Sequence, residues 1–355
     1  MRAGVVVSAQ PGVEDLAARA EELGLHSFWV NDTPMVHGDP FVALGLCAKA
    51  TSRIRLGIGV TSPALRSAPA AASGLASLNA LAPGRIVCGV GTGNTARRTL
   101  GMRPTTTARL EHFVAALPDL CAGRPTEYRE GDRVREIRFL HGGAHVNTAD
   151  PIEFVVAALL GPKAAAVAGR RGTGLVSFGL LDPAAWHALH EARRRAARAA
   201  HLEPDAPKDS YAVTALHLLD EGEDPHGDAA RDATGHLVLS LLAFAADTVA
   251  EKPALAEQLG PEANEAVRRL LVRRGTTATA PDRHTRLYPG YLGRIAPRDR
   301  DLVLPSLMRT LALVGTRDDL LDRIAALERA GVDELLIQPV VDPPAEMARL
   351  ARLLA

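Results

Sequence analysis

The sequence has little cysteine, few aromatic residues and no excess of charge of either sign. Three cysteines occur in 355 residues, at Cys47, Cys88 and Cys121, and they form neither a C-x-x-C pair nor the framework of a secreted domain. We therefore expect buried thiols in a reducing compartment. Lys plus Arg and Asp plus Glu number 41 each. This balance argues against nucleic acid as a partner and favours a small-molecule substrate.

The sequence also lacks an evident signal peptide or membrane span. The apolar run that follows Met1 is too short for the h-region of a signal peptide, and no later run reaches the apolar length that a bilayer requires. We expect a cytoplasmic protein with no membrane partner.

Short β-branched runs alternate with amphipathic helical segments, a pattern typical of parallel strands joined by helical crossovers. Eight such runs are present, and eight parallel strands close a barrel. We predict a (β/α)₈ TIM barrel that forms a single domain over residues 1–355. The predicted strands are Ala3–Val7, Ser27–Val30, Arg55–Val60, Ile86–Val90, Ile152–Ala157, Gly174–Phe178, Tyr211–Leu218 and Glu334–Pro339.

Two segments depart from the regular alternation. Residues 223–310, between the seventh and eighth strands, are far longer than one crossover helix, so we predict a helical insertion that covers the C-terminal mouth of the barrel. Residues 123–150 are rich in charge, and we expect an exposed excursion there without chemistry.

Glycine-rich sequences after strands also invite comparison with an open dinucleotide-binding sheet. The first strand is followed only by SAQPG, and Gly89–Gly93 is followed by Arg97 and Arg98, so neither matches the phosphate-binding fingerprint of that fold. The closed barrel is the better interpretation.

Glycine and polar residues gather where four of the predicted strands end. In a barrel, the C-terminal strand ends line the functional mouth, and glycine lets a flat ligand approach the backbone. These ends read WVNDT (Trp29–Thr33), LGIGVTSP (Leu56–Pro63), CGVGTGN (Cys88–Asn94) and AALLGPK (Ala157–Lys163).

The run from Leu56 to Asn94 resembles the signature of the luciferase-like flavin and deazaflavin oxidoreductases. Flanking segments agree: AEELGLHSFWVND before it, TLGMRPTTTARLEHF after it, and VGTRDDLLDRIAALERAGVDELLIQP near the C-terminus. Within that superfamily, SPALRSAPAAA (Ser62–Ala72) is similar to the branch of methylenetetrahydromethanopterin reductase, whose cofactor is the deazaflavin F420.

The resemblance implies a cofactor site at the barrel mouth. A non-proline cis peptide would fall at Gly59–Val60 against the ring, with Asp32 beside it and the loop Gly91–Asn94 lining it. Gly161, Pro162 and Lys163 would open the helix that holds the cofactor phosphate. The full set of implied cofactor-binding residues is Asp32, Gly59, Val60, Thr61, Gly91, Thr92, Gly93, Asn94, Ala158, Gly161, Pro162 and Lys163.

The catalytic acid or base is less well defined by the resemblance. Several relatives place histidine directly after the acidic residue of the second strand, whereas Thr33 follows Asp32 here. We assign catalysis to Asp32 and Thr33, with His37 or a residue of the insertion as alternatives.

Further polar residues with ligand-binding side chains occur in the insertion and before the fifth strand. In the insertion, Tyr288, Tyr291 and Arg294 are candidate substrate contacts, because aromatic and cationic side chains over a barrel mouth can hold a ligand. His141 and His145 have no Cys or carboxylate at ligand spacing, so we expect no metal.

These features predict an oxidoreductase that transfers a hydride between F420 and a small organic substrate. The alternatives are an FMN-dependent luciferase-like monooxygenase and a cofactor-free barrel whose site has drifted. The apolar segment Phe41–Ala50 is consistent with a homodimer, as in relatives that pair through this region.

Overall fold

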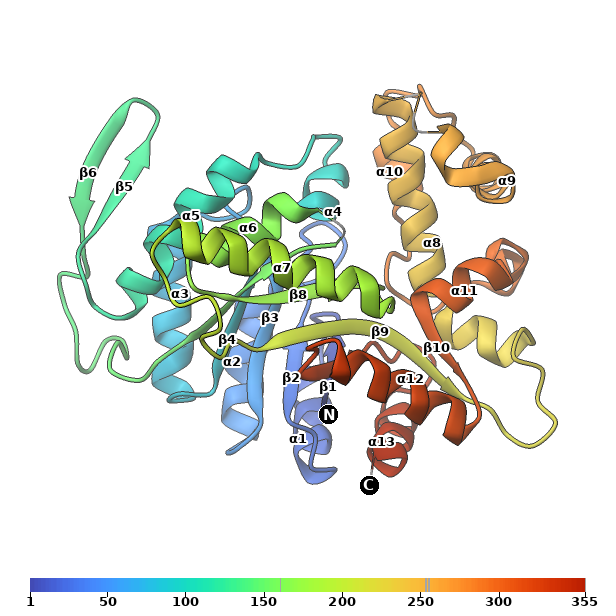
Figure 1. Cartoon of the computed structure of the whole chain (residues 1–355), viewed down its shortest axis with the longest axis horizontal. Helices are drawn as coiled ribbons and strands as arrows, with labels where there is room; N and C mark the ends of the chain where they lie inside the picture. The colour runs from blue at the N-terminus through green and yellow to red at the C-terminus, as the bar shows by residue number, and fades with distance from the viewer. Residues whose placement is uncertain (160, 253, 255, 355) are drawn as a thin grey trace.

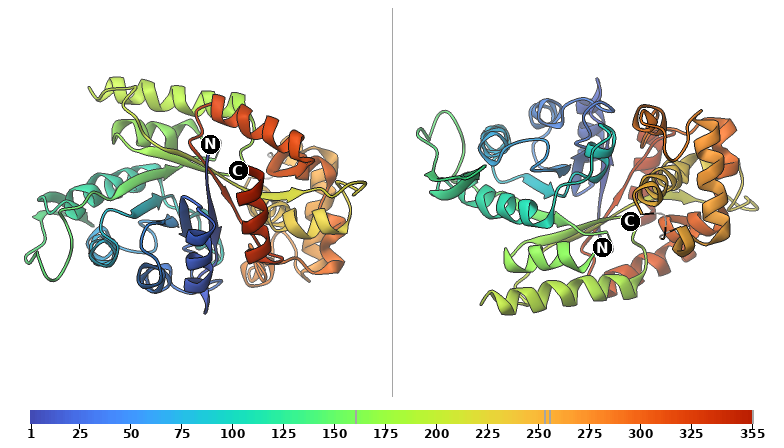
Figure 2. Two further views of the ribbon diagram at one scale, coloured as in Figure 1. Left: turned by 90° about the horizontal axis from the view of Figure 1, so that it is seen from below. Right: turned by 90° about the horizontal axis from the view of Figure 1, so that it is seen from above.

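A computed structural model of the chain describes residues 1–159, 161–252, 254 and 256–354. Eight parallel strands close a barrel with helices around its outside (Figures 1 and 2). The barrel strands are β1 (Arg2–Val7), β2 (Ser27–Val30), β3 (Arg55–Thr61), β4 (Ile86–Val90), β7 (Glu153–Ala157), β8 (Gly174–Phe178), β9 (Ser210–Leu218) and β11 (Glu334–Ile337). The predicted TIM barrel is confirmed.

The barrel is closed by the pairing of its first and last strands. β1 pairs in parallel with β11, with Val5 opposite Ile337, and the consecutive strands β8 and β9 also pair, with Val176 opposite Tyr211. All eight strands point the same way, so their C-terminal ends meet at one mouth.

The outer helices begin at residues that suit a helix start. Asp39, Ser67, Thr106, Asp182 and Thr316 each accept backbone N–H groups of the first turn at their N-caps. The outer helices are α1 (Val13–Glu22), α2 (Pro40–Ala50), α3 (Ala68–Leu81), α4 (Asn94–Arg98), α5 (Thr107–Cys121), α6 (Pro162–Arg170), α7 (Pro183–Ala199), α12 (Arg317–Arg329) and α13 (Pro343–Leu354). Cys47, Cys88 and Cys121 are buried beneath this layer as predicted.

The segment between β9 and β11 is helical, as the predicted fold requires. It contains α8 (Asp228–Glu251), α9 (Ala256–Arg273), α10 (Arg283–Leu287), the 3₁₀ helix η2 (Pro297–Leu302), α11 (Pro305–Leu311) and a short strand, β10 (Ala312–Gly315). These helices enclose a hydrophobic cluster of their own, and β10 extends the sheet by pairing with the end of β9 (Figure 1). The strand β10 is absent from the sequence-based prediction.

The expectation that no segment reaches the apolar length of a membrane span is wrong. Helix α8 is long and apolar enough, by length and composition, to cross a bilayer. In the fold, 61% of its most apolar window is buried, and the helix also carries the buried Asp232 and Asp247. The apolar composition is that of a helix at the core of the insertion.

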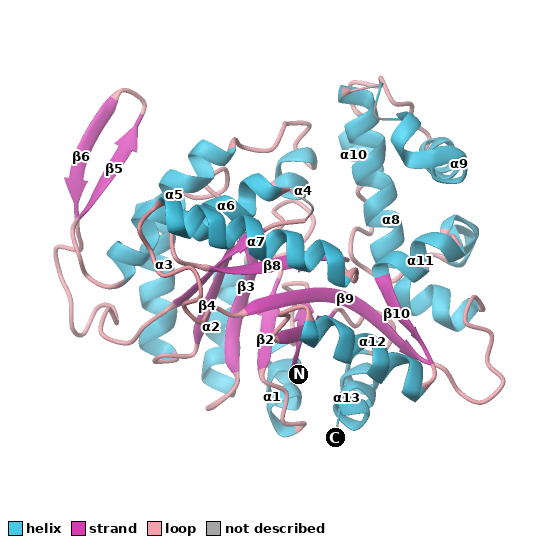
Figure 3. Cartoon of the chain, in the orientation of Figure 1, coloured by secondary structure: helices cyan, strands magenta, loops and turns pink. Residues whose placement is uncertain are grey.

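The charged excursion contains regular structure that the sequence analysis does not predict. Strands β5 (Thr126–Glu130) and β6 (Arg133–Ile137) form an antiparallel hairpin, which projects away from the barrel (Figure 3). Its side chains are largely exposed, so the apolar alternation that marks a half-buried strand is missing.

The barrel interior is filled around the fully buried ring of Trp29. This ring lies edge-on to Tyr211, with 5.0 Å between ring centroids. A Cβ atom at Gly57 on the neighbouring strand would stand 2.1 Å from Trp29 Cδ2. Glycine at position 57 is therefore required by the ring of Trp29.

A hydrogen-bond chain continues from Trp29 toward the N-terminal end of the barrel. Trp29 Nε1 donates to Ser27 Oγ at 2.7 Å, and Ser27 Oγ donates to the carboxylate of Glu334. Glu334 is 0% exposed, and burial raises the pKa of its carboxyl group from 4.5 to about 7.

This pKa predicts a pH-dependent contribution to stability. Because the folded state holds the Glu334 proton more tightly than the unfolded state, the contribution is present below the unfolded pKa and is lost as pH rises through about 7. Relative to Glu334→Gln, the wild type should lose up to about 3 kcal/mol in free energy of unfolding across that window, by urea denaturation.

The control is Glu22→Gln, since the Glu22 side chain is 65% exposed and pairs with Arg19 on its own helix. That variant should follow the wild-type pH profile. If Glu334→Gln also follows it, the carboxyl of Glu334 is not protonated in the folded state.

Candidate functional site

The predicted site residues meet at the C-terminal mouth of the barrel. Asp32 follows β2, Gly59 lies near the end of β3, and Gly91 follows β4. Gly161 follows β7 and is the N-cap of α6. One predicted segment, Ala157–Lys163, includes residue 160, which lies outside the described residues.

Asp32 forms an ion pair with Arg66 at this mouth. Arg66 Nη1 donates to Asp32 Oδ2 at 2.5 Å, and Arg66 Nη2 contacts the carboxylate of Asp39. The Asp32 side chain is 1% exposed. Burial raises the pKa of Asp32 above its usual range, and the positive charge of Arg66 partly offsets that rise.

Arg66 is a site residue that the sequence analysis does not predict. Its guanidinium lies 4.5 Å from the centroid of the Phe41 ring, which fixes its orientation beside α2. The only signal in the sequence is its place within SPALRSAPAAA, the run that carries the family resemblance.

The end of β3 has the backbone feature that the resemblance implies. The Gly59–Val60 peptide bond is cis. The Val60 side chain lies over β4, where a Cβ at Gly89 would approach it to 2.6 Å and one at Gly91 to 3.0 Å. These two glycines of CGVGTGN therefore make room for the Val60 side chain. The sequence analysis instead expects glycine at this strand end to let a flat ligand approach the backbone.

Buried polar atoms without partners surround the same mouth. Among the described residues, no hydrogen-bond partner within 3.5 Å is found for Asn31 Nδ2, Thr61 Oγ1 or the side-chain amide of Gln338. The Thr61 hydroxyl is nevertheless close enough to the Asp32 carboxylate to lower its pKa. Asn31, Thr61 and Gln338 are each at most 2% exposed, and they follow β2, end β3 and follow β11. Unsatisfied buried polar atoms are costly, so the mouth suits a ligand that presents hydrogen-bonding groups.

The loop after β4, residues 91–94, connects the part of the mouth beside Val60 with the insertion. Gly91 is buried, whereas Thr92, Gly93 and Asn94 are half-buried, and Gly93 caps α4 in the left-handed conformation with φ of 70°. Arg98, at the end of α4, donates to Asn94 Oδ1 at 2.9 Å and to Glu251 Oε1 of α8 at 3.0 Å.

The start of α6 has the form expected of an anion site. Pro162 occupies the first turn, where a missing N–H is no loss, and Gly161, Pro162 and Lys163 are all exposed. Ala158, which directly follows β7, is 1% exposed and donates its backbone N–H to Val176 O of β8.

Two groups near Asp32 can donate or accept a proton. Thr33 directly follows it and is 7% exposed. His37 is half-buried, its ring lies 3.3 Å from Ser8 Oγ at the end of β1, and burial lowers the pKa of its imidazole. His37 is therefore neutral near pH 7.

The sequence that builds this site matches the model of a known family. The model of that family, described as luciferase-like monooxygenase, matches residues 10–334. The chain belongs to the luciferase-like monooxygenase family.

Curated relatives in this family are similar at moderate identity. An F420-dependent glucose-6-phosphate dehydrogenase of Kineococcus radiotolerans is 35% identical over 50% of this chain and 56% of its own length. The chain thus spans little more than half of that relative. A 5,10-methylenetetrahydromethanopterin reductase of Methanolobus tindarius is 26% identical over 94% of this chain and 91% of its own length. The expected membership of the luciferase-like family is confirmed.

Solved structures show the same fold. A coenzyme F420 dependent tetrahydromethanopterin reductase from Methanopyrus kandleri has a TM-score of 0.67 at 20% identity, covering 99% of this chain and 97% of its own. An oxygenating constituent of 3,6-diketocamphane monooxygenase of Pseudomonas putida, in complex with FMN, has a TM-score of 0.64 at 17% identity, covering 100% and 96%.

The candidate substrate residues of this family member occupy different positions. Tyr291 places its hydroxyl 2.8 Å from Thr95 Oγ1, next to the loop that ends at Asn94, and so reaches the mouth. Tyr288 is 5% exposed and donates its hydroxyl to Asp247 inside the insertion. The Arg294 side chain is 60% exposed, with a nitrogen 4.0 Å from Asp232 Oδ2. The structure thus joins Tyr291, but neither Tyr288 nor Arg294, directly to the loop after β4.

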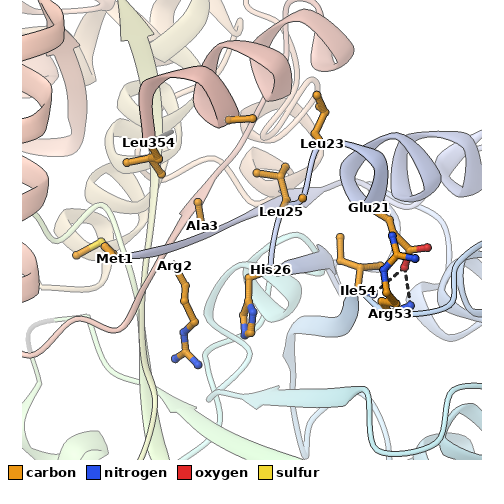
Figure 4. Close-up of a pocket in the computed structure, with 12 residues that line it drawn as sticks. Met1, Arg2, Ala3, Glu21, Leu23, Leu25, His26, Arg53, Ile54 and Leu354 are labelled. Atoms are coloured by element: carbon orange, nitrogen blue, oxygen red, sulfur yellow. Dashed lines mark hydrogen bonds between the residues drawn. The ribbon is translucent and has the colours of Figure 1, made fainter.

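A large cavity at the other end of the barrel is a poor candidate for the reaction site. It has a volume of about 630 Å³ and is lined by residues that include Arg2, Leu25, His26 and Leu354. Figure 4 shows Arg2 and His26 extending from the starts of β1 and β2. In TIM barrels this N-terminal face serves stability.

The ion pair between Asp32 and Arg66 should contribute to the stability of the fold. Arg66→Gln leaves the buried Asp32 carboxylate without its cation, so it should lower the free energy of unfolding by about 3 kcal/mol at pH 7, by urea denaturation. The double variant Asp32→Asn with Arg66→Gln should recover most of that loss.

Arg124→Gln is the matched control, because Arg124 is 61% exposed in its pair with Asp119 and should cost at most about 1 kcal/mol. Equal costs for Arg66→Gln and Arg124→Gln would show that the charge of Asp32 does not depend on Arg66.

Proposed function

We propose that this chain is an F420-dependent oxidoreductase acting on a small organic substrate at the barrel mouth. The observation that carries the proposal is the set of buried, unpartnered polar atoms of Asn31, Thr61 and Gln338, which lie where β2, β3 and β11 end, at the same mouth as Val60. A deazaflavin carries hydrogen-bonding groups along one edge of a flat apolar ring, which suits such a lining. Relatives named as F420-dependent dehydrogenases support this cofactor over FMN.

The cofactor would be held by one group of residues at its ring and by another at its phosphate. Asn31, Thr61 and Gln338 would hydrogen-bond the polar edge of the ring, and Val60 would contact its face. The phosphate would bind at the start of α6, where backbone amides and Lys163 favour an anion. When bound, the deazaflavin supplies hydride chemistry.

The protein side chains would then manage protons and orientation. Asp32, held by Arg66, would fix the polar surroundings of the reacting carbon. His37, neutral and adjacent to Ser8, would accept the proton released when the substrate is oxidised, and the imidazolium so formed would return it in the reverse direction. The backbone N–H of His37 donates to Thr33 O, so Thr33 would help to orient it. Tyr291 would help the insertion exclude water at the mouth.

The phosphate position gives a direct test by fluorescence titration with F420 and FMN. F420 should bind the wild type more tightly than FMN does, and Lys163→Glu should weaken F420 binding by at least about tenfold. The matched control is Lys208→Glu. Lys208 is exposed and lies just before β9, at the N-terminal end of the barrel and so away from the mouth, and this variant should bind F420 as the wild type does.

A phosphate-free deazaflavin serves as the ligand control and should bind both variants alike. Equal weakening of both deazaflavins by Lys163→Glu would show that the phosphate lies elsewhere. Tighter binding of FMN would favour the monooxygenase alternative, and binding of neither cofactor would overturn the proposal in favour of a drifted site.

We also propose a homodimer formed through α2. This helix exposes Val42 at 68% and Leu46 at 48%, next to Leu81 at 47%. Such a contiguous apolar face suits a subunit contact. Val42→Glu should shift the wild-type dimer toward monomer in sedimentation equilibrium, whereas Val272→Glu, at an exposed site on α9, should not. A monomeric wild-type protein would contradict the proposal.

A further inference from the structure

The insertion contains a cavity of its own, apart from the barrel mouth. Its volume is about 130 Å³, several times the roughly 10–15 Å³ that one water needs by this measure. It is lined by one face of α8, by α9 and by the segment 287–299. Tyr291 also lines it, so the cavity and the mouth share this residue.

His236 of α8 is the most unusual residue of this cavity. It is 2% exposed, and among the described residues neither of its ring nitrogens has a hydrogen-bond partner. Burial lowers the pKa of its imidazole to about 3, so the ring is neutral and offers one donor and one acceptor. A buried polar group left in this state costs stability unless a water or ligand completes it.

Two more polar residues, Asp299 and Arg274, line the same cavity. Asp299 is 2% exposed, and its Oδ1 accepts no hydrogen bond from the described residues, although it lies 3.5 Å from Arg273 Nη1. Asp299 Oδ2 lies 3.5 Å from Arg274 Nη2, and the Nε of Arg274 is likewise without a partner.

The charges around the cavity do not cancel. Two cations, Arg274 and Arg294, and one carboxylate, that of Asp299, line it, while His236 is neutral. Arg294 is the more exposed of the two cations and also lies 4.0 Å from Asp232, outside the lining, so the half-buried Arg274 is the main cation of the cavity. Asp299 also has Arg273 at 3.5 Å. The cavity therefore has an excess of positive charge, which favours an anion over a neutral molecule.

The remaining lining is apolar. Leu239, Ala243, Leu270 and Leu287 supply hydrocarbon surface beside the polar groups. A ligand that fits must therefore be small, carry one negative charge at one end, and have a short apolar part at the other.

We propose that this cavity is a binding site for a small aliphatic monocarboxylate. The carboxylate meets the guanidinium of Arg274 and the imidazole N–H of His236, and the alkyl part packs on the leucines of α8 and α9. The groups that would hold the carboxylate, Arg274 and His236, belong to the insertion, and Tyr291 is the lining residue that also reaches the mouth.

Butyrate is a suitable probe for isothermal titration calorimetry on the full chain, with butyramide as the uncharged control of similar shape. Butyrate should bind saturably, and butyramide should bind at least about tenfold more weakly. Arg274→Gln and His236→Leu should each reduce butyrate affinity by at least about tenfold. His236→Leu keeps an apolar group in place, so it remains informative if Arg274→Gln fails to fold.

Arg268→Gln is the matched control, because Arg268 lies on α9 with a side chain that is 72% exposed, outside the cavity. This variant should bind butyrate as the wild type does. Absence of saturable butyrate binding, equal binding of butyramide, or unchanged affinity in both cavity variants would overturn the proposal and leave water as the occupant. Because no cofactor is used, these outcomes are separate from the test of the F420 site.

Discussion

The packing of Trp29 inside the barrel is the constraint on which the rest of the structure depends. Its ring occupies the space that a side chain at Gly57 would otherwise take, contacts Tyr211 across the barrel, and donates through Ser27 to Glu334. This one side chain therefore joins β2, β3, β9 and β11 at mid-depth. The strand ends above it, where Asp32, Val60 and Gln338 gather, are positioned by that shared layer.

The mouth and the insertion are also linked by polar contacts. Arg98 of α4 reaches Glu251 of α8 at 3.0 Å, and Tyr291 reaches Thr95 at 2.8 Å. Asp247 of α8 accepts from Arg283 and from Tyr288, so the helices of the insertion are in turn held to one another. An insertion fixed in this way can cover the mouth while it keeps a hydrophobic core of its own. Substitutions in the insertion can therefore change which substrate binds while the cofactor site in the barrel stays the same.

The sequence predicts the barrel well because its strands are buried on both faces and read as continuous β-branched runs. It misses β5 and β6, whose residues are exposed and charged, and β10, whose four residues follow a helix directly. At the site, Asp32 and the loop at Gly91–Asn94 are predictable from position alone. The ion pair of Asp32 with Arg66 is not, because it depends on how the chain folds between β3 and α3. The glycines at 89 and 91 show the same limit, since their need arises from Val60 on another strand.

A crystal structure of the protein with F420 is the most direct test of this cofactor site. The deazaflavin ring should contact Val60; Asn31, Thr61 and Gln338 should gain hydrogen bonds to its polar edge, and the phosphate should lie at Gly161–Lys163. F420 bound at the N-terminal end of the barrel, or a mouth in which Asn31, Thr61 and Gln338 remain without partners when the cofactor is present, would contradict this placement of the cofactor.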